Sequence, residues 1–202
     1  MNQELSPIFQ AKNKVIHIFG LPGTYKTAFL VQIIWQKLKE GIDQIFLVDA
    51  SGNFPYVKLK PIEDLLSNLI VFQPKSLKEE LLIIDDLEIK GVADTTILLI
   101  DDIFHRINPE EENHLESYLL AIIQALSQRI SFPIFLTNQG RGFENRIHPL
   151  RATLMTRYFD NHLFFQKSTK KNVIQIMKLI NDRHEFLTEL QVDPSGFFPD
   201  MF

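Results

Sequence analysis

The sequence predicts an α/β fold in which a mostly parallel sheet is covered by helices on both faces. Short, continuously apolar segments recur through the first two thirds of the chain, and amphipathic segments with helical spacing separate them. Strands that are apolar throughout are typical of parallel sheets with both faces buried. The length of 202 residues suits one domain with a substantial core, so we expect residues 1–202 to form a single domain.

Each element follows from its local pattern. Apolar residues at helical spacing predict helices at residues 27–40, which Gly41 can end, and at residues 111–129. Residues 81–88, "LLIIDDLE", fit a strand or a helix. Near the end of the chain the polar turn "STKK" separates two apolar segments, which predicts antiparallel strands. The five strands expected before that hairpin are residues 14–19, 44–49, 68–74, 95–102 and 132–138.

Composition and charge narrow the possible function classes. The chain has no cysteine, which excludes disulfides and thiol catalysis. No apolar run approaches the length of a membrane span, so we expect a cytoplasmic protein without membrane contact. Residues 79–116 carry a net charge of −10 and residues 141–183 one of +6. Either these segments form faces for two partners of opposite charge, or both are solvated surfaces.

A glycine-rich loop, "GLPGTYKT" at residues 20–27, follows the first predicted strand and opens the first predicted helix. This order of residues in this context is typical of a mononucleotide-binding loop, whose backbone N–H groups suit phosphate oxygens. Lys26 would reach the β- and γ-phosphates of ATP, and the Thr27 hydroxyl would hold Mg²⁺. The residues expected to bind the nucleotide are Gly20, Gly23, Thr24, Tyr25, Lys26, Thr27 and Ala28.

Tyr25 departs from the usual motif, which has glycine before the lysine because a Cβ there would approach the β-phosphate. Phosphate binding is compatible with Tyr25 if its φ stays negative and its ring turns to solvent or onto the base. The alternative is a decayed loop that is kept for folding alone.

A phosphate loop also needs a carboxylate at the end of a nearby strand to hold the water shell of the metal. Asp85 and Asp101 both follow apolar runs, and Asp101 ends the better buried strand. We therefore expect Asp101 beside the metal and Asp85 in an acidic surface turn. The adjacent Asp102 either orients a water molecule or caps a helix or turn.

Four motifs resemble those of the RecA-type recombinases of archaea and eukaryotes, in particular their small RadB-like paralogues. They are the phosphate loop, "FLVDASGNF" at residues 46–54, "LLIDDIFHR" at residues 98–106 and "FLTNQ" at residues 135–139. The resemblance implies a RecA-like P-loop ATPase core with C-terminal antiparallel strands and no N-terminal DNA-binding domain. It also implies that Asp101 lies on the metal side, and that Gln139 senses the γ-phosphate and precedes a DNA-binding loop.

Two departures set this chain apart from that family. Ser51 stands where the family motif has a water-activating glutamate, and a serine cannot act as a carboxylate base at neutral pH. Where recombinases continue the metal strand with a basic, glycine-rich DNA loop, this chain has "INPEEEN" at residues 107–113, which would repel a phosphate backbone. Asp102 and Gln139 remain as the candidate catalytic residues.

Residues 141–151, directly after Gln139, combine arginines with one aromatic residue. Arginines can contact phosphates while an aromatic ring stacks on a base, which is how many proteins bind single-stranded DNA. Alternatively, the arginines pair with the acidic segment and the aromatic ring packs on the core. The candidate DNA-binding residues are Arg141, Phe143, Arg146 and Arg151.

Together these features predict an accessory recombinase paralogue that binds ATP and Mg²⁺, hydrolyses ATP weakly, and assists a RadA-type recombinase on single-stranded DNA. Such a protein would work in archaeal recombination and repair, in the cytoplasm at the nucleoid, as a homo- or hetero-oligomer. Two alternatives stay open. One is an interaction module with a degenerate nucleotide site, and the other is an active P-loop ATPase such as a helicase loader.

Overall fold

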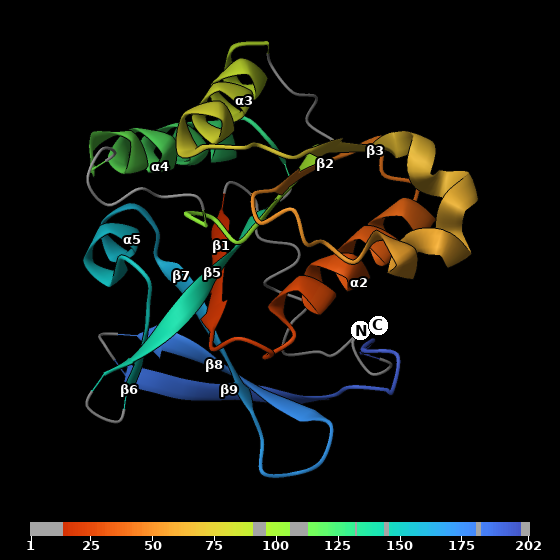
Figure 1. Cartoon of the computed structure of the whole chain (residues 1–202), viewed down its shortest axis with the longest axis vertical. Coiled ribbons are helices and arrows are strands. Elements are labelled where there is room, and N and C mark those ends of the chain that lie inside the picture. Colours follow the sequence, from red (N-terminus) through yellow and green to blue (C-terminus); the bar gives the residue numbers. More distant parts are fainter. Residues whose placement is uncertain are drawn as a thin grey trace.

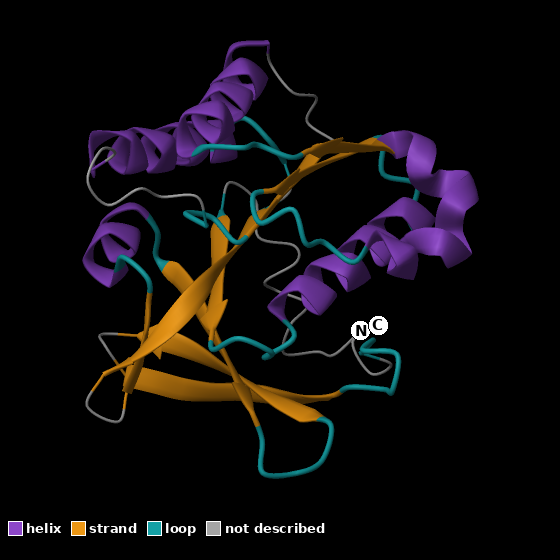
Figure 2. Cartoon of the chain, in the orientation of Figure 1, coloured by secondary structure: helices purple, strands orange, loops and turns teal. Residues whose placement is uncertain are grey.

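The computed structural model describes residues 14–90, 96–105, 113–131, 133–143, 146–180 and 183–198. Within these residues a nine-stranded sheet forms the centre of the molecule, and helices lie on both of its faces (Figures 1 and 2). The strands are β1 (Val15–Gly20), β2 (Gln44–Asp49), β3 (Leu69–Phe72), β4 (Thr96–Asp101), β5 (Ile134–Phe143), β6 (Arg146–Pro149), β7 (Asn161–Lys167), β8 (Val173–Ile180) and β9 (Arg183–Gln191). The helices are α2 (Lys26–Lys39), the 3₁₀ segment η1 (Tyr56–Asn68), α3 (Leu77–Lys90), α4 (Asn113–Ser127) and α5 (Ala152–Tyr158).

The sheet is parallel at its centre and antiparallel at its C-terminal end. Its strand order is β3-β2-β4-β5-β1-β7-β8-β9, and β6 pairs with β5 outside this path. All pairs from β3 across to β7 are parallel, whereas β8 and β9 add as antiparallel strands. The predicted fold class is therefore confirmed. The strands β1 and β4 are buried along their whole length because helices cover them from both sides.

Two apolar cores lie on the two faces of the sheet. Alternate residues of each strand point to opposite faces, so Leu99 of β4 packs in one core and Ile100 in the other. The first core lies under α2 and η1 and includes Phe29, which is fully buried. The second lies under α3, α4 and α5 (Figure 1) and includes Ile123 of α4.

The local predictions hold for most elements and fail at two places. Residues 81–88, which fit a strand or a helix by sequence, form part of helix α3. Asp85 therefore lies in a helix, and its predicted position in a surface turn was wrong. Strand β5 continues five residues beyond the predicted end at residue 138. The acidic residues 107–112 lie outside the described residues.

The helix α2 ends as its sequence predicts. Gly41, directly after it, has a φ of 79°, a left-handed conformation that suits glycine. The N–H of Gly41 donates to the carbonyl oxygen of Leu38 at 3.1 Å. Among the described helices of the chain, none has the length and apolar character needed to cross a membrane.

Candidate functional site

The loop between β1 and α2 depends on close backbone approaches. A Cβ on Gly20 would lie 2.4 Å from the carbonyl oxygen of Phe165 and 2.7 Å from Thr24 Oγ1, so no larger residue fits there. Gly23 has a φ of 76°, which glycine adopts without strain. Residues 23–28 line an open pocket of about 430 Å³. The loop thus has the shape and the room that a ligand at the start of α2 requires.

Tyr25 does not have the negative φ that we expected for it. Its φ is 64° and its ψ is 20°, a left-handed conformation that costs a non-glycine residue roughly 1–2 kcal/mol. Its ring is half-buried and packs against the core under α2, instead of turning to solvent. The backbone at this position nevertheless follows the path that a glycine adopts with ease. The tyrosine therefore strains the loop without changing its course.

Lys26, Thr27 and Asp101 come together beside this loop. The ammonium of Lys26 donates to the carbonyl oxygens of Gly20 at 2.9 Å and of Leu21 at 3.2 Å. Burial lowers the pKa of Lys26, and the carboxylates of the β4 end oppose this effect. The hydroxyl of Thr27 lies 3.1 Å from each carboxylate oxygen of Asp101. The residue pair chosen from the sequence as metal ligands is thus in direct contact.

The carboxylate of Asp101 is almost completely buried. Burial raises its pKa to about 6, although hydrogen bonds from the hydroxyls of Thr137 and Thr27 act in the opposite direction. Thr137 donates to Asp101 Oδ1 at 2.7 Å. Hydroxyl and carboxylate oxygens suit Mg²⁺, which keeps further ligands from phosphate and water. The oxygen donors of Thr27 and Asp101 therefore fit a magnesium ion.

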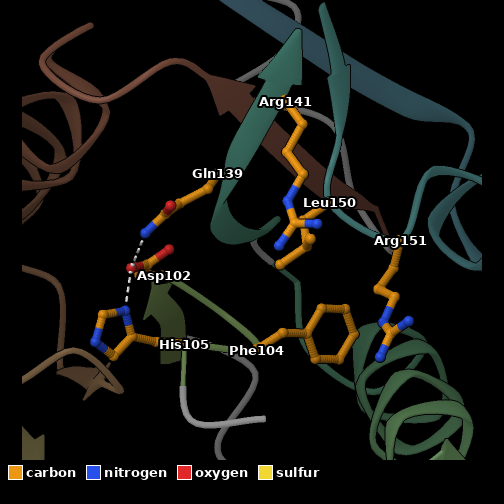
Figure 3. Close-up of a pocket in the computed structure, with 7 residues that line it drawn as sticks. All are labelled: Asp102, Phe104, His105, Gln139, Arg141, Leu150 and Arg151. Atoms are coloured by element: carbon orange, nitrogen blue, oxygen red, sulfur yellow. Dashed lines mark hydrogen bonds and ion pairs between the residues drawn. The ribbon is translucent and has the colours of Figure 1, made fainter. Parts of the chain in front are cut away.

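A second polar cluster joins the ends of β4 and β5. The carboxylate oxygen Asp102 Oδ2 accepts a hydrogen bond from Gln139 Nε2 at 3.0 Å and lies 2.7 Å from His105 Nδ1. Figure 3 shows these three side chains along one side of a pocket of about 400 Å³, into which Arg141 also points. Asp102 has a φ of 61°, and its N–H donates to Thr137 Oγ1 at 2.7 Å. The two predicted catalytic residues thus contact each other directly.

The sheet topology explains why these groups meet. The carboxyl ends of parallel strands lie at one edge of the sheet, where ligands of open α/β sheets bind. Asp101 ends β4, and Gln139 lies opposite Gly20 in the register of β5 against β1. Residues that are far apart in the sequence therefore converge on the phosphate loop.

No family model matches the chain. The DNA repair and recombination protein RadB of Methanosphaera stadtmanae is 27% identical over 140 residues, which cover 63% of this chain and 60% of that protein. RadB of Pyrococcus abyssi is 26% identical over 191 residues, covering 89% of this chain and 80% of that protein. RadB of Methanococcus maripaludis is 21% identical over 192 residues, which cover 88% of this chain and 85% of that protein.

Among solved structures, a crystal structure of the RadB recombinase matches with a TM-score of 0.73 and 19% identity, over 93% of this chain and 90% of that one. The chain is thus similar to RadB proteins in sequence and in fold, in agreement with the resemblance that its motifs show. A solved ATPase domain of another protein matches at a TM-score of 0.64 with 13% identity, covering 92% of this chain and 84% of that domain. A DnaB-like replicative helicase matches at 0.63 with 14% identity, covering 94% of this chain and 57% of its own length. These solved structures support the fold.

At the end of β2 stands Ser51, the residue that departs from the motif of the RecA-type recombinases. The Ser51 hydroxyl donates to Asp49 Oδ1 at 3.2 Å and accepts the N–H of Asn53 at 3.1 Å, so it stabilises the turn that follows the strand. Asp49 itself is fully buried. Burial alone would raise its pKa, but hydrogen bonds from the Gln73 amide and the Tyr56 hydroxyl hold the pKa below its usual value. The end of β2 therefore carries a network of hydrogen bonds that stabilises the backbone turn after the strand.

The segment expected to bind DNA contains two antiparallel strands, because residues 140–143 of β5 pair with residues 146–149 of β6. Strand β5 pairs with β6 up to Phe143 and Arg146, whose side chains lie outside the described part of the structure. Arg141 is exposed. Arg151 lies at the start of α5, and its Nη2 is 2.8 Å from Oε1 of the buried Glu116. For Arg151 the alternative interpretation, pairing with the acidic segment, describes the contact.

The base of this hairpin lies directly on the phosphate loop. A Cβ on Gly140 would be 3.0 Å from the carbonyl carbon of Gly20 and 2.8 Å from Ile147 Cγ2. Only glycine permits so close an approach of the two backbones. The hairpin and the loop are therefore in backbone contact.

Sequence reasoning missed three residues that organise the site: Thr137, His105 and Asp49. The hydroxyl of Thr137 bridges the neighbouring residues Asp101 and Asp102, and no local pattern marks it. His105 follows Asp102 by three residues, the spacing of a turn. Asp49 followed by glycine at residue 52 is a turn signal that could have been recognised.

Proposed function

We propose that this chain is an accessory recombinase paralogue that binds Mg²⁺–ATP, hydrolyses it slowly, and assists a RadA-type recombinase on single-stranded DNA. The observation that carries the proposal is the contact of Thr27 with Asp101 beside Lys26, at the carboxyl edge of a parallel sheet. The relatives named as DNA repair and recombination proteins support the recombination role.

The nucleotide-binding part rests on how the loop is built. Lys26 would exchange its two carbonyl partners for phosphate oxygens, since its ammonium is a strong donor to anions. Thr27 and Asp101 would hold the magnesium ion, which would supply charge neutralisation of the phosphates. Residues at the N-terminal end of α2 line the same pocket, and the free backbone N–H groups of a helix N-terminus suit phosphate oxygens.

Slow hydrolysis follows from the absence of a base at Ser51. A carboxylate that accepts a proton from the attacking water typically contributes about 10²–10⁴-fold to the rate. The hydroxyl of Ser51 cannot accept that proton at neutral pH, and it is engaged with Asp49 and Asn53. Gln139 would still report on the γ-phosphate, because an amide can donate to phosphate oxygen in place of Asp102.

An active P-loop ATPase is the second candidate, and the cluster around Asp102 favours it. The carboxylate of Asp102 is oriented by both His105 and Gln139 and lies at the edge of an open pocket. Such an oriented carboxylate can position a water molecule as a general base does. The two candidates differ in turnover rate, so hydrolysis measurements separate them.

DNA binding would use the exposed part of β5 that carries Arg141. Arg141 is exposed two residues beyond Gln139, on the same strand. Residues i and i+2 of a strand lie on one face, so the two side chains line the same pocket. Arg151 contributes less to this surface, because it is paired with Glu116.

The test of the proposal is a titration with a fluorescent ATP analogue, with and without Mg²⁺, for the parent protein and for Lys26→Ala. We expect saturable binding by the parent that requires Mg²⁺ for full affinity, and binding weakened at least about tenfold by loss of the charged hydrogen bonds of Lys26. Circular dichroism checks that the variant is folded. Absence of binding by the parent at millimolar ATP would refute the proposal in favour of an interaction module.

A further inference from the structure

A second lysine lies against the phosphate loop. Lys167 is the last residue of β7, and its Nζ is 3.3 Å from the position that a Cβ on Gly23 would occupy. Together with residues 23–28, Lys167 lines the open pocket of about 430 Å³ at the start of α2. Its ammonium group therefore borders the space in which the phosphates of a nucleotide would lie.

The sheet fixes this position through backbone contacts. Strand β7 runs parallel to β1, with Phe164 opposite Phe19, and it continues beyond the end of β1. The carbonyl oxygen of Phe165 closely approaches Gly20, at the start of the loop. Lys167 is itself paired with Ile174 of β8. The backbone of Lys167 is thus held by β8, two residues beyond the contact of Phe165 with the phosphate loop.

The charge of Lys167 is available to a ligand. Its side chain is exposed, and within the described residues no carboxylate forms an ion pair with it. Lys170 on the same hairpin differs, because its Nζ lies 2.7 Å from Glu189. Lys26 approaches the loop from the helix and Lys167 from the adjacent strand. A polyanion in the pocket would therefore meet two ammonium groups.

We propose that Lys167 is a second phosphate-binding residue of the nucleotide site, contributed by the same chain that carries Lys26. The inference rests on the proposed function, because it assumes that the pocket binds a nucleotide. A lysine is a compact charge on a flexible stem, so Lys167 can follow a phosphate group over a few ångströms. Its role is to bind the phosphate chain from the side of β7, while Lys26 binds it from the side of α2.

The experiment compares Lys167→Ala, Lys167→Arg and Lys171→Ala with the parent protein in titrations with labelled ATP at low salt. Lys171 is the matched control, since it is an exposed lysine on the same hairpin turn. Loss of one charged hydrogen bond should weaken binding about tenfold in Lys167→Ala, while the other two variants should stay within about threefold of the parent. Inorganic tripolyphosphate should also displace labelled ATP. Its dissociation constant from this competition should be about tenfold lower for the parent than for Lys167→Ala.

The outcomes separate this inference from the proposed function. If the parent binds ATP and Lys167→Ala binds it equally well, the inference is wrong and the proposed function stands. Equal loss in Lys171→Ala, or a loss of oligonucleotide binding with unchanged ATP affinity, would also overturn it. If the parent binds neither ATP nor tripolyphosphate, both fail.

An equimolar mixture of Lys26→Ala and Lys167→Ala chains tests whether Lys167 acts within its own chain. Each chain of this mixture lacks one of the two lysines, so a site within one chain stays incomplete. We expect the mixture to bind ATP as weakly as the separate variants. Restored affinity would assign Lys167 to the site of a neighbouring chain and overturn the inference.

Discussion

Replacing Glu80 by glutamine should remove a dependence of folding stability on pH. Glu80 lies on α3 with no exposed surface, and both of its carboxylate oxygens lack a hydrogen-bond partner in the described structure. Burial, with a smaller contribution from the charge of Asp102, raises the pKa of Glu80 to about 8. The folded protein therefore holds this group protonated at neutral pH, whereas the unfolded chain ionises it above its ordinary pKa of 4.5.

The sign and the size follow from this difference. Because the folded state binds the extra proton, the contribution of Glu80 to stability is fully present below pH 4.5 and is lost as the pH rises to about 8. Each pH unit in that window costs about 1.4 kcal/mol, so raising the pH from 5 to 7 costs about 2.5 kcal/mol. Glutamine resembles the protonated acid in shape and cannot ionise, so Glu80→Gln avoids this loss.

The assay is thermal or urea unfolding of the parent and of Glu80→Gln at pH 5 and pH 7. The free energy of unfolding of the variant minus that of the parent should be about 2.5 kcal/mol larger at pH 7 than at pH 5. The difference in melting temperature between the two proteins should accordingly be larger by roughly 5–10 °C at pH 7. His17 and Asp101 also have shifted pKa values, but they are common to both proteins and cancel. Glu63→Gln, at an exposed position, is the control. Equal differences between variant and parent at both pH values would refute the reasoning.

Three further predictions concern the site. In the titration with the fluorescent ATP analogue, Tyr25→Gly should keep the affinity within about threefold of the parent, because glycine adopts the observed left-handed backbone. Tyr25→Val should weaken the affinity. Loss of binding in Tyr25→Gly would contradict this reasoning. DNA-independent turnover by the parent, measured as phosphate release, should stay well below about 1 s⁻¹; a faster rate that Asp102→Asn abolishes would favour the active ATPase. Arg141→Ala combined with Arg146→Ala should reduce the affinity for single-stranded oligonucleotides and lower the salt dependence of that affinity. Fluorescence anisotropy measures both, with Arg183→Ala as a control. Unchanged binding would place the DNA elsewhere.

The parts of the fold that sequence predicted are those with a local cause. The strands β1, β2 and β4 are buried on both faces, so their residues had to be apolar throughout, and this pattern is visible in the chain itself. The phosphate loop was recognisable for the same reason, since its glycines and Lys26 serve the geometry of one short segment.

The parts that sequence did not predict depend on contacts between distant segments. Helix α3 was ambiguous because apolar residues 81–84 look the same in a buried strand and in a helix packed on another helix. The backbone at Tyr25 is set by the loop and the core under it, against the preference of tyrosine. The continuation of β5 beyond residue 138 depends on pairing with β6, a contact between separate segments that no local pattern specifies.

The backbone contact between Gly20 and Gly140 has a mechanical consequence. Where side chains separate two elements, a small displacement of one is absorbed when those side chains change rotamer. Between two glycines there is nothing to deform, because a Cβ on Gly140 would already be only 3.0 Å from the backbone of Gly20. The contact is therefore stiff, and a shift of the phosphate loop toward the hairpin must displace the strand that carries Gln139 and Arg141.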